Sequence, residues 1–100
     1  MARFDVFVRA DGGPGYLLDC QADLLSHLNT RFVVPLLPMG AAPRPAARLN
    51  PVFEILGAPH LMVTQFAAAV LSKELGGKVT SLSEQDTVII NALDMLISGV

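Results

Sequence analysis

The sequence lacks several features that would place it in a particular class. It has a single cysteine, Cys20, so no disulfide can form within the chain, which is typical of a protein from a reducing cytoplasm. It has no run of about 18 apolar residues, and its first residues lack the apolar stretch of a signal peptide. Its seven basic residues against nine acidic ones exclude the basic excess of a nucleic-acid-binding protein. We therefore expect a cytoplasmic protein that binds neither a membrane nor nucleic acid directly.

Apolar side chains are what the sequence has in excess. Hydrophobic residues make up 52% of the chain and charged residues 16%, whereas average usage is roughly 25% charged. One hundred residues correspond to about one domain, and a domain of this size buries roughly 60–70% of the surface of its unfolded chain. We therefore predict a single domain over residues 1–100. We also predict an apolar surface patch that a partner covers, because such patches usually mark contact sites.

Runs of apolar, β-branched and aromatic residues predict five strands. The predicted strands are residues 4–9, 16–20, 31–37, 52–56 and 60–64. The first two flank the glycine-rich loop 11–15 and the last two flank the turn 57–59, so each pair predicts a hairpin. Pro35 cannot donate a ladder hydrogen bond and is expected at a sheet edge or a bulge.

The rest of the chain predicts a loop and two helices. Residues 38–51 contain four prolines and predict a long surface loop, which in a small domain is usually functional or disordered. Good helix formers in residues 65–75 predict a helix that Gly76-Gly77 would end. The last 17 or so residues predict an amphipathic helix of roughly 25 Å, with apolar positions at helical spacing: Ile89, Ala92, Leu93, Leu96, Ile97 and Val100. Ser83 and Asp86 predict a capping box at its start, and Gly99 predicts its end.

No arrangement of residues predicts catalysis or a metal site. The candidate nitrogen and sulfur ligands are too scattered for zinc: Cys20, His27 and His60. Cys20 is interpreted as a small buried hydrophobic residue and both histidines as loop residues. Asp19 and Asp23 are interpreted as solvated or capping acids. Arg31, beside a strand edge, could bind an anion, but no companion base is evident.

Four segments are similar in order and spacing to those of a known family. Residues 19–25 (DCQADLL) are similar to a DVQSDII stretch, and residues 31–36 (RFVVPL) are similar to an RMVIPL strand. Residues 49–52 (LNPV) precede the central hairpin, and an acidic turn after Leu82-Ser83 leads into NALDML at residues 91–96. Together these segments resemble the CcdB toxins of bacterial toxin–antitoxin systems. In this family the segment that matches residues 66–75 is largely extended, which implies a strand from about Val70.

The resemblance implies a mainly β fold: an SH3-like antiparallel sheet or barrel with one long C-terminal helix. It implies a homodimer with the two C-terminal helices side by side, and a toxin that is not an enzyme and needs no cofactor. Such a toxin binds the A subunit of DNA gyrase and traps the gyrase–DNA cleavage complex. Its other partner is a cognate antitoxin, partly disordered, that folds onto it.

The resemblance also carries site residues over by position. The gyrase-binding residues would be Leu24, Leu25, Asp94, Ile97, Ser98, Gly99 and Val100. The antitoxin-binding residues would lie in loops 9–15 and 41–50, and would include Arg9, Asp11, Arg44 and Arg48. From the sequence alone, Leu24, Leu25 and Ile97 could equally be core residues, and Gly99 could be only a helix stop.

Two positions depart from the family pattern. Ser98 stands where the best-known gyrase poisons have a tryptophan, and the chain contains no tryptophan. An interface tryptophan can supply apolar contact and a cation–π interaction, and truncating such a residue commonly costs about 2 kcal/mol or more. Asp94 stands where an asparagine is common. Two alternatives therefore stay open: a CcdB-fold protein that keeps its dimer and antitoxin but has lost gyrase poisoning, or a MazF-like endoribonuclease anchored on Arg31.

Overall fold

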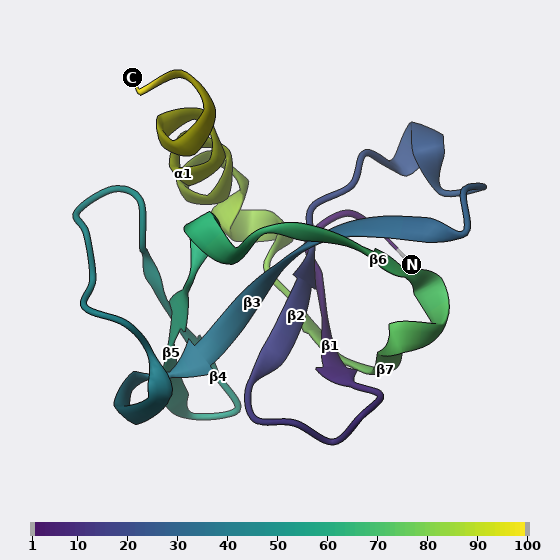
Figure 1. Ribbon diagram of the computed structural model, residues 1–100, viewed down its shortest axis with the longest axis horizontal. Coiled ribbons are helices and arrows are strands. Elements are labelled where there is room, and N and C mark those ends of the chain that lie inside the picture. Colours follow the sequence, from purple (N-terminus) through teal and green to yellow (C-terminus); the bar gives the residue numbers. More distant parts are fainter. Residues whose placement is uncertain (1, 100) are drawn as a thin grey trace.

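The computed structural model describes residues 2–99, and its strands form one antiparallel sheet with a helix packed against it (Figure 1). The strands are β1 (Asp5–Arg9), β2 (Tyr16–Asp19), β3 (Thr30–Pro38), β4 (Val52–Ile55), β5 (Ala58–Met62), β6 (Ala68–Leu71) and β7 (Leu75–Ser81). The sheet order is β4-β5-β3-β2-β1-β7, and β6 also pairs with β3. The helix α1 spans Asp86–Ser98. No helix among the described residues is long and apolar enough to cross a membrane.

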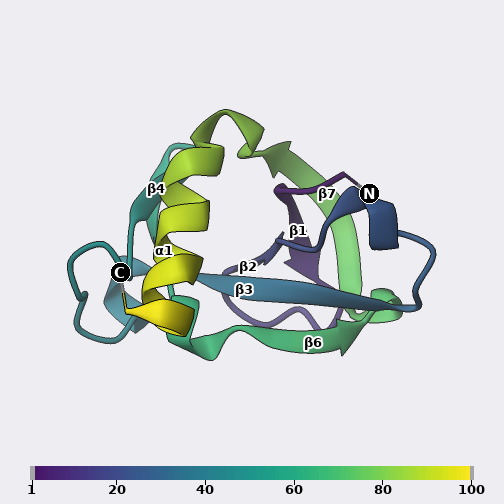
Figure 2. The same cartoon turned by 90° about the horizontal axis from the view of Figure 1, so that it is seen from above.

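The long strand β3 organises the sheet. On one side it pairs with β2, and on the other it pairs first with β6 and then with β5. The chain passes from β6 through the short turn η4 (Ser72–Glu74) into β7, which pairs with β1. The sheet therefore curls back on itself into a half-barrel, with α1 beside it (Figure 2). The predicted fold class is confirmed: a mainly β, curled antiparallel sheet with one C-terminal helix.

The two faces of the sheet have different surroundings. Side chains alternate between faces along a strand, and one face supplies Val6, Leu18, Val34 and Leu36 to the hydrophobic core. Ile89, Ala92 and Leu93 of α1 belong to the same core. Burying a Val, Leu or Ile side chain fully contributes about 1.5–3 kcal/mol, so this cluster fixes the helix on the sheet. The opposite face carries the alternate residues of the same strands.

Pro35 lies at a gap in the pairing of β3 rather than at a sheet edge or a bulge. Its carbonyl oxygen accepts a hydrogen bond from the Val63 N–H at 2.9 Å. In an antiparallel strand the N–H and C=O of one residue point to the same side. The missing N–H of Pro35 therefore points to the side where the partner of β3 changes from β6 to β5, so the interruption falls between the two ladders.

The second predicted hairpin is confirmed, but its turn is shifted. The turn consists of Leu56 and Gly57, with φ of 51° and 82°, and β5 already starts at Ala58. Two consecutive positive φ values are typical of a two-residue type I′ turn, whose twist matches that of the flanking strands. The prediction of a turn at residues 57–59 was wrong because Leu56 is not a residue that signals this turn type.

The helix predicted for residues 65–75 is wrong. The chain there forms the turn η3 (Thr64–Phe66), the edge strand β6 and the turn η4, so the strand implied by the resemblance is correct. Gly76 is not a helix stop but lies in β7. A Cβ atom on Gly76 would lie 2.6 Å from Val8 Cγ2 and 2.9 Å from the Val8 carbonyl oxygen. The glycine is needed for the close approach of β7 to β1, and the strand pairing outweighs the helix propensity of the alanines.

The C-terminal helix starts later than predicted and ends as predicted. Ser83 lies in the turn η5 (Ser83–Gln85), α1 starts at Asp86, and no side chain caps its N-terminus. The predicted capping box is therefore wrong. Gly99 has φ of 74°, and its N–H donates to the Met95 carbonyl oxygen at 3.0 Å, which is a left-handed helix end. Val100, which was predicted to extend the apolar stripe, lies outside the described residues.

The loop predicted for residues 38–51 is confirmed for residues 39–51, since Pro38 still belongs to β3, but its C-terminal part is anchored. After the turn η2 (Met39–Ala41), the buried Asn50 donates from Nδ2 to the Met62 carbonyl oxygen (3.0 Å) and to Gln65 Oε1 (2.7 Å). Its Oδ1 accepts from the Ala46 N–H at 2.9 Å. These bonds tie the end of the loop to the last residue of β5 and to the turn η3.

Candidate functional site

The C-terminal end of α1 leaves an apolar surface in one protomer. Ile89, Ala92 and Leu93 are buried as the predicted stripe required, whereas Leu96 is 42% and Ile97 79% exposed. We call the exposed set the helix-end surface; it consists of Asp94, Leu96, Ile97, Ser98 and Gly99. The Ser98 hydroxyl donates to the Asp94 carbonyl oxygen at 2.8 Å, so it is bonded within its own helix. Four of the predicted gyrase-binding residues therefore share this surface, and the fifth helix-end residue, Val100, is not described.

The other two predicted gyrase-binding residues lie elsewhere. Leu24 and Leu25 belong to the turn η1 (Asp23–Leu25) and are 87% and 43% exposed, so they are not core residues. Leu28, three residues after Leu25, is also exposed. No motif in the sequence predicted it as a contact residue. Figures 1 and 2 place this turn on the opposite side of the protomer from the end of α1. One protomer therefore does not bring the two groups together.

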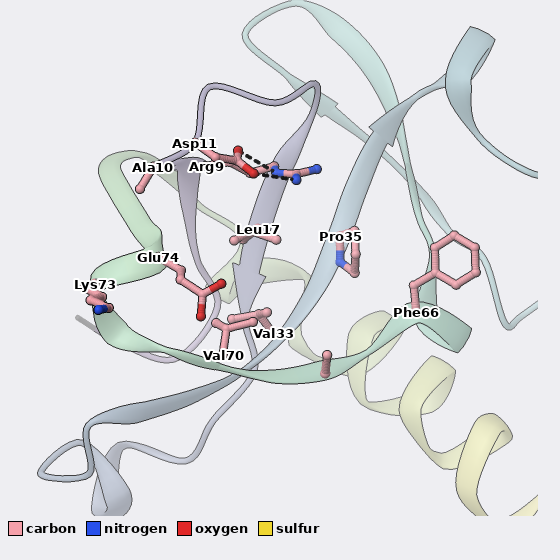
Figure 3. A pocket seen from close by; sticks show the side chains of 11 residues that line it. Arg9, Ala10, Asp11, Leu17, Val33, Pro35, Phe66, Val70, Lys73 and Glu74 are labelled. Carbon is pink, nitrogen blue, oxygen red and sulfur yellow. Dashed lines mark hydrogen bonds and ion pairs between the residues drawn. The ribbon is translucent and has the colours of Figure 1, made fainter.

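A cleft of about 480 Å³ opens on the face of the sheet opposite the α1 core (Figure 3). We call it the sheet cleft. Its apolar lining consists of Ala10, Leu17, Val33, Pro35, Phe66, Ala68 and Val70, and its charged lining of Arg9, Asp11, Lys73 and Glu74. Figure 3 shows Lys73 and Glu74 at one side and Phe66 at the other, with Leu17 and Val33 between them. Sequence reasoning found only Arg9 and Asp11 of this set, because most of the apolar residues come from the three strands β2, β3 and β6 and from the turn η3, which are distant in the sequence.

Arg9 and Asp11 form a two-pronged ion pair at the margin of the sheet cleft. Arg9 Nε donates to Asp11 Oδ1 at 3.2 Å, and Nη2 donates to Oδ2 at 2.9 Å. Asp11 Oδ1 also accepts from the Gly13 N–H at 2.8 Å. The hydrogen bond from Arg9, followed by that from Gly13, lowers the pKa of the Asp11 carboxyl. The pair holds the β1–β2 loop in place beside the cleft.

The other two predicted antitoxin-binding residues are separate from this cleft. Arg44 and Arg48 are exposed on the loop that follows η2. In both views this loop lies on the same side of the protomer as the end of α1 (Figures 1 and 2). Arg48 has φ of 67°, which is unusual for a residue other than glycine. The predicted antitoxin residues therefore fall into two groups, one at the sheet cleft and one near the helix-end surface.

Asp19 and Arg31 form a buried ion pair, so the prediction that Asp19 is solvated or capping was wrong. Both side chains are fully buried, and Arg31 Nε and Nη2 donate to Asp19 Oδ2 at 3.0 and 2.5 Å. Asp19 is paired in register with Val33, which makes Arg31 its diagonal neighbour on the same face. Because the guanidinium is enclosed, Arg31 cannot bind an anion from solvent. Asp23, by contrast, is exposed as predicted and accepts from the Arg3 N–H at 2.7 Å.

The remaining candidate ligands do not form a site. His60 is buried in β5, with its ring centroid 5.1 Å from that of Tyr16, so the prediction of a loop residue was wrong; His27 is exposed in a turn, as predicted. Cys20 is buried as predicted, and burial raises the pKa of its thiol to about 12. Within residues 2–99, no group of three His, Cys, Asp or Glu residues is arranged to hold a metal ion.

The sequence was compared with models of known protein families and with curated proteins. The family model described as CcdB protein matches residues 3–99, which is nearly the whole chain. No curated protein matches the sequence. The match covers both the helix-end surface up to Gly99 and every residue that lines the sheet cleft.

Proposed function

The chain belongs to the CcdB family of toxin–antitoxin toxins, and on that premise we propose that it acts in the bacterial cytoplasm as a homodimer that binds the DNA gyrase A subunit and traps the gyrase–DNA cleavage complex. It acts by protein–protein contact and not as an enzyme. A cognate antitoxin neutralises it. Because the toxin would act only through its contact surface, the proposal depends on which apolar side chains remain exposed in the fold.

The helix-end surface is the observation that carries this proposal. Ile97 is 79% exposed, although burial of such a side chain is worth about 1.5–3 kcal/mol. Leu96 is exposed beside it on the last turn of α1. Exposed apolar groups of this kind usually mark protein–protein contacts. Contact with a second protomer or with gyrase would bury these apolar side chains.

The ribonuclease alternative has less support. A catalyst of RNA cleavage needs a cation that reaches the phosphate, and Arg31 is the only anchor that the sequence offered for this task. Its guanidinium is fully buried and bonded to Asp19. Exposing it would break a buried ion pair, which costs about 3–5 kcal/mol when one partner is left alone. A ribonuclease activity would therefore require other residues.

A second candidate function, a toxin relic that has lost gyrase poisoning, is favoured by the state of Ser98. This residue is exposed, small and bonded to its own helix. It cannot supply the apolar contact of an anchor tryptophan, whose truncation commonly costs about 2 kcal/mol or more. At 1.4 kcal/mol per factor of ten, this corresponds to a loss of about thirtyfold in affinity.

The variant Ser98→Trp separates the two candidates. Purified gyrase and supercoiled DNA are incubated with wild type, Ser98→Trp or Ser98→Ala, and linear DNA is measured after denaturation. If the protein poisons gyrase, wild type produces linear DNA, and Ser98→Trp does so at a concentration about thirtyfold lower. Ser98→Ala is the matched control, because it removes the hydroxyl without adding a ring, and it should behave like wild type.

The other outcomes are equally informative. Linear DNA with Ser98→Trp alone supports the relic, since the scaffold then lacks only its anchor. If none of the three proteins produces linear DNA under conditions where a known gyrase poison is active, the assignment to gyrase is contradicted.

A growth assay tests the toxin–antitoxin pairing separately. Expression of the toxin should stop growth, and coexpression of the antitoxin should restore it.

A further inference from the structure

The turn η1 presents apolar side chains to solvent and buries none. Leu24 and Leu25 of the turn and Leu28 just after it are 87%, 43% and 42% exposed, and none of the three residues of η1 is buried. The hydrophobic core therefore does not hold this segment, and segments with few buried contacts are the ones that open locally. Hydrogen bonds to better-buried parts of the chain must determine where these leucines lie.

Gln21 connects the turn to the sheet through both ends of its side-chain amide. The residue lies between β2 and η1 and is 9% exposed. Its Nε2 donates to the Leu25 carbonyl oxygen at 3.0 Å, and its Oε1 accepts from the Phe32 N–H of β3 at 3.0 Å. Because the amide group is planar, the position of the strand sets the direction of the bond to the turn.

The backbone of Gln21 is held in turn by the buried ion pair. The Gln21 N–H donates to Asp19 Oδ1 at 3.1 Å, while Asp19 Oδ2 accepts from Arg31. Both charged side chains are fully buried, and a hydrogen bond to a carboxylate is about twice as strong as one between neutral groups. A continuous series of bonds therefore runs from the interior through Gln21 to Leu25.

The other side-chain bond to η1 within the described residues is more exposed. The Arg3 N–H donates to Asp23 Oδ1 at 2.7 Å, at an exposed position. Water competes for such a bond, so its net contribution is small. The bond from Gln21 to Leu25 is partly buried. Gln21 is therefore the residue whose removal should loosen the turn most.

We propose that Gln21 is a positioning residue for gyrase binding, whose amide holds η1 so that Leu24 and Leu25 meet the gyrase A subunit in one orientation. This inference rests on the proposed function, because it assumes that these leucines contact gyrase. Gln21 acts through the turn, since its side chain is buried and both ends of its amide are occupied. An ordered turn loses less conformational entropy on binding than a mobile one, so loss of Gln21 lowers affinity without removing a contact.

Substitution of Gln21 by methionine tests the role of the amide. Affinity for the full-length gyrase A subunit is measured by surface plasmon resonance, at a temperature where circular dichroism shows each variant to be folded. Gln21→Met keeps the length of the side chain but removes both hydrogen bonds, and it should weaken binding about tenfold. Gln85→Met makes the same change at an exposed glutamine of η5 and should stay within about twofold of wild type.

The same substitution on two backgrounds shows whether Gln21 acts through the turn. In Leu24→Ala/Leu25→Ala the contact side chains are already missing, so Gln21→Met should weaken binding by about twofold or less. In Ile97→Ala the turn is intact, so the loss should again be about tenfold, because the effects of distant sites add. A general loss of stability would give the same factor on both backgrounds. Equal factors therefore overturn the proposal.

The outcomes separate failure of this inference from failure of the proposed function. Wild type that binds gyrase A together with an unchanged Gln21→Met overturns the positioning role and leaves the function intact. Wild type that does not bind gyrase A overturns the function, and the role of Gln21 in gyrase binding with it. Gln21→Ser covers the case in which Gln21→Met does not fold, because a small side chain lets water reach the freed groups. It should also weaken binding about tenfold, and an unchanged affinity contradicts the proposal.

Hydrogen exchange measures the hold on the turn independently of any partner. The Leu28 N–H donates to the same Leu25 carbonyl oxygen at 3.1 Å. Its exchange with solvent should be faster in Gln21→Met than in wild type, because the turn opens more often. An unchanged exchange rate overturns the positioning role even if gyrase affinity falls.

Discussion

The buried ion pair between Asp19 and Arg31 gives the sharpest prediction about stability. Asp19→Asn keeps the size and shape of the side chain but removes its charge. Arg31 then remains fully buried and positively charged, without its counter-ion. Its Nη1 already has no hydrogen-bond partner in the structure, so no other described group compensates. We expect Asp19→Asn to be one of the most destabilising polar substitutions in this protein.

The size of the effect follows from the environment of the pair. Removing one partner of a buried ion pair costs about 3–5 kcal/mol, whereas whole domains are stable by about 5–15 kcal/mol. For a domain of this size, 1 kcal/mol corresponds to about 4–8 °C in Tm. The variant should therefore melt at least about 12 °C below wild type.

Thermal and urea unfolding followed by far-UV circular dichroism measures this change. Protein concentration must be held constant, because the proposed dimer would make apparent stability concentration-dependent. Asp23→Asn is the matched control: Asp23 is exposed four residues away and should change stability by about 0.5 kcal/mol or less. The double variant Asp19→Leu/Arg31→Met should recover most of the loss, since apolar replacement of a buried pair is often neutral. A loss below about 1 kcal/mol for Asp19→Asn would refute the argument from an uncompensated buried charge.

Two further predictions concern Cys20 and the β4–β5 turn. The folded thiol of Cys20 has a pKa of about 12 against an ordinary value of 9.0. Iodoacetamide at pH 8 should therefore modify it about a thousandfold more slowly than in urea, and stability should fall as pH rises from about 9 toward 12 because only the unfolded state then loses the proton. Cys20→Ala should remove that part of the pH dependence. Leu56 is exposed at φ of 51°, so Leu56→Asn should raise the free energy of unfolding in urea by about 0.5–1 kcal/mol. Gly57→Ala, at φ of 82°, should lower it, and the reverse order would contradict the turn assignment.

The sequence correctly predicted the elements whose local residue pattern favours the same secondary structure that the tertiary fold requires. The first three strands and the second hairpin are runs of apolar, β-branched and aromatic residues bounded by turn residues, which is the local pattern typical of strands. The edge strand β6 has no such pattern, because Ala68 and Ala69 are both exposed and pack little. Its state is set by backbone pairing to β3, which lies more than thirty residues earlier in the chain. Local propensity therefore predicted a helix there, and only the resemblance indicated a strand.

The environment of Asp19 illustrates a second limit. An aspartate at the end of a predicted strand is usually solvated, and nothing in its neighbouring residues indicates burial. Its burial depends on the register that sets β2 against β3 and places Arg31 at the diagonal position. A shift of one residue would turn either side chain to the opposite face. Register, rather than composition, therefore determines whether this charge is part of the interior.

The position of the predicted gyrase-binding residues has a consequence for how they can act. Sequence similarity assigned them one by one, and it carries no information about which of them share a surface. The turn η1, which contains Leu24 and Leu25, lies on the opposite side of the protomer from the end of α1 (Figure 2), although both groups are exposed. A partner that contacts both groups must either extend around one protomer or meet them where two protomers adjoin. Substitutions in the two groups should therefore be tested separately, because loss of activity at Ile97 without loss at Leu24 would place the contact at the helix end alone.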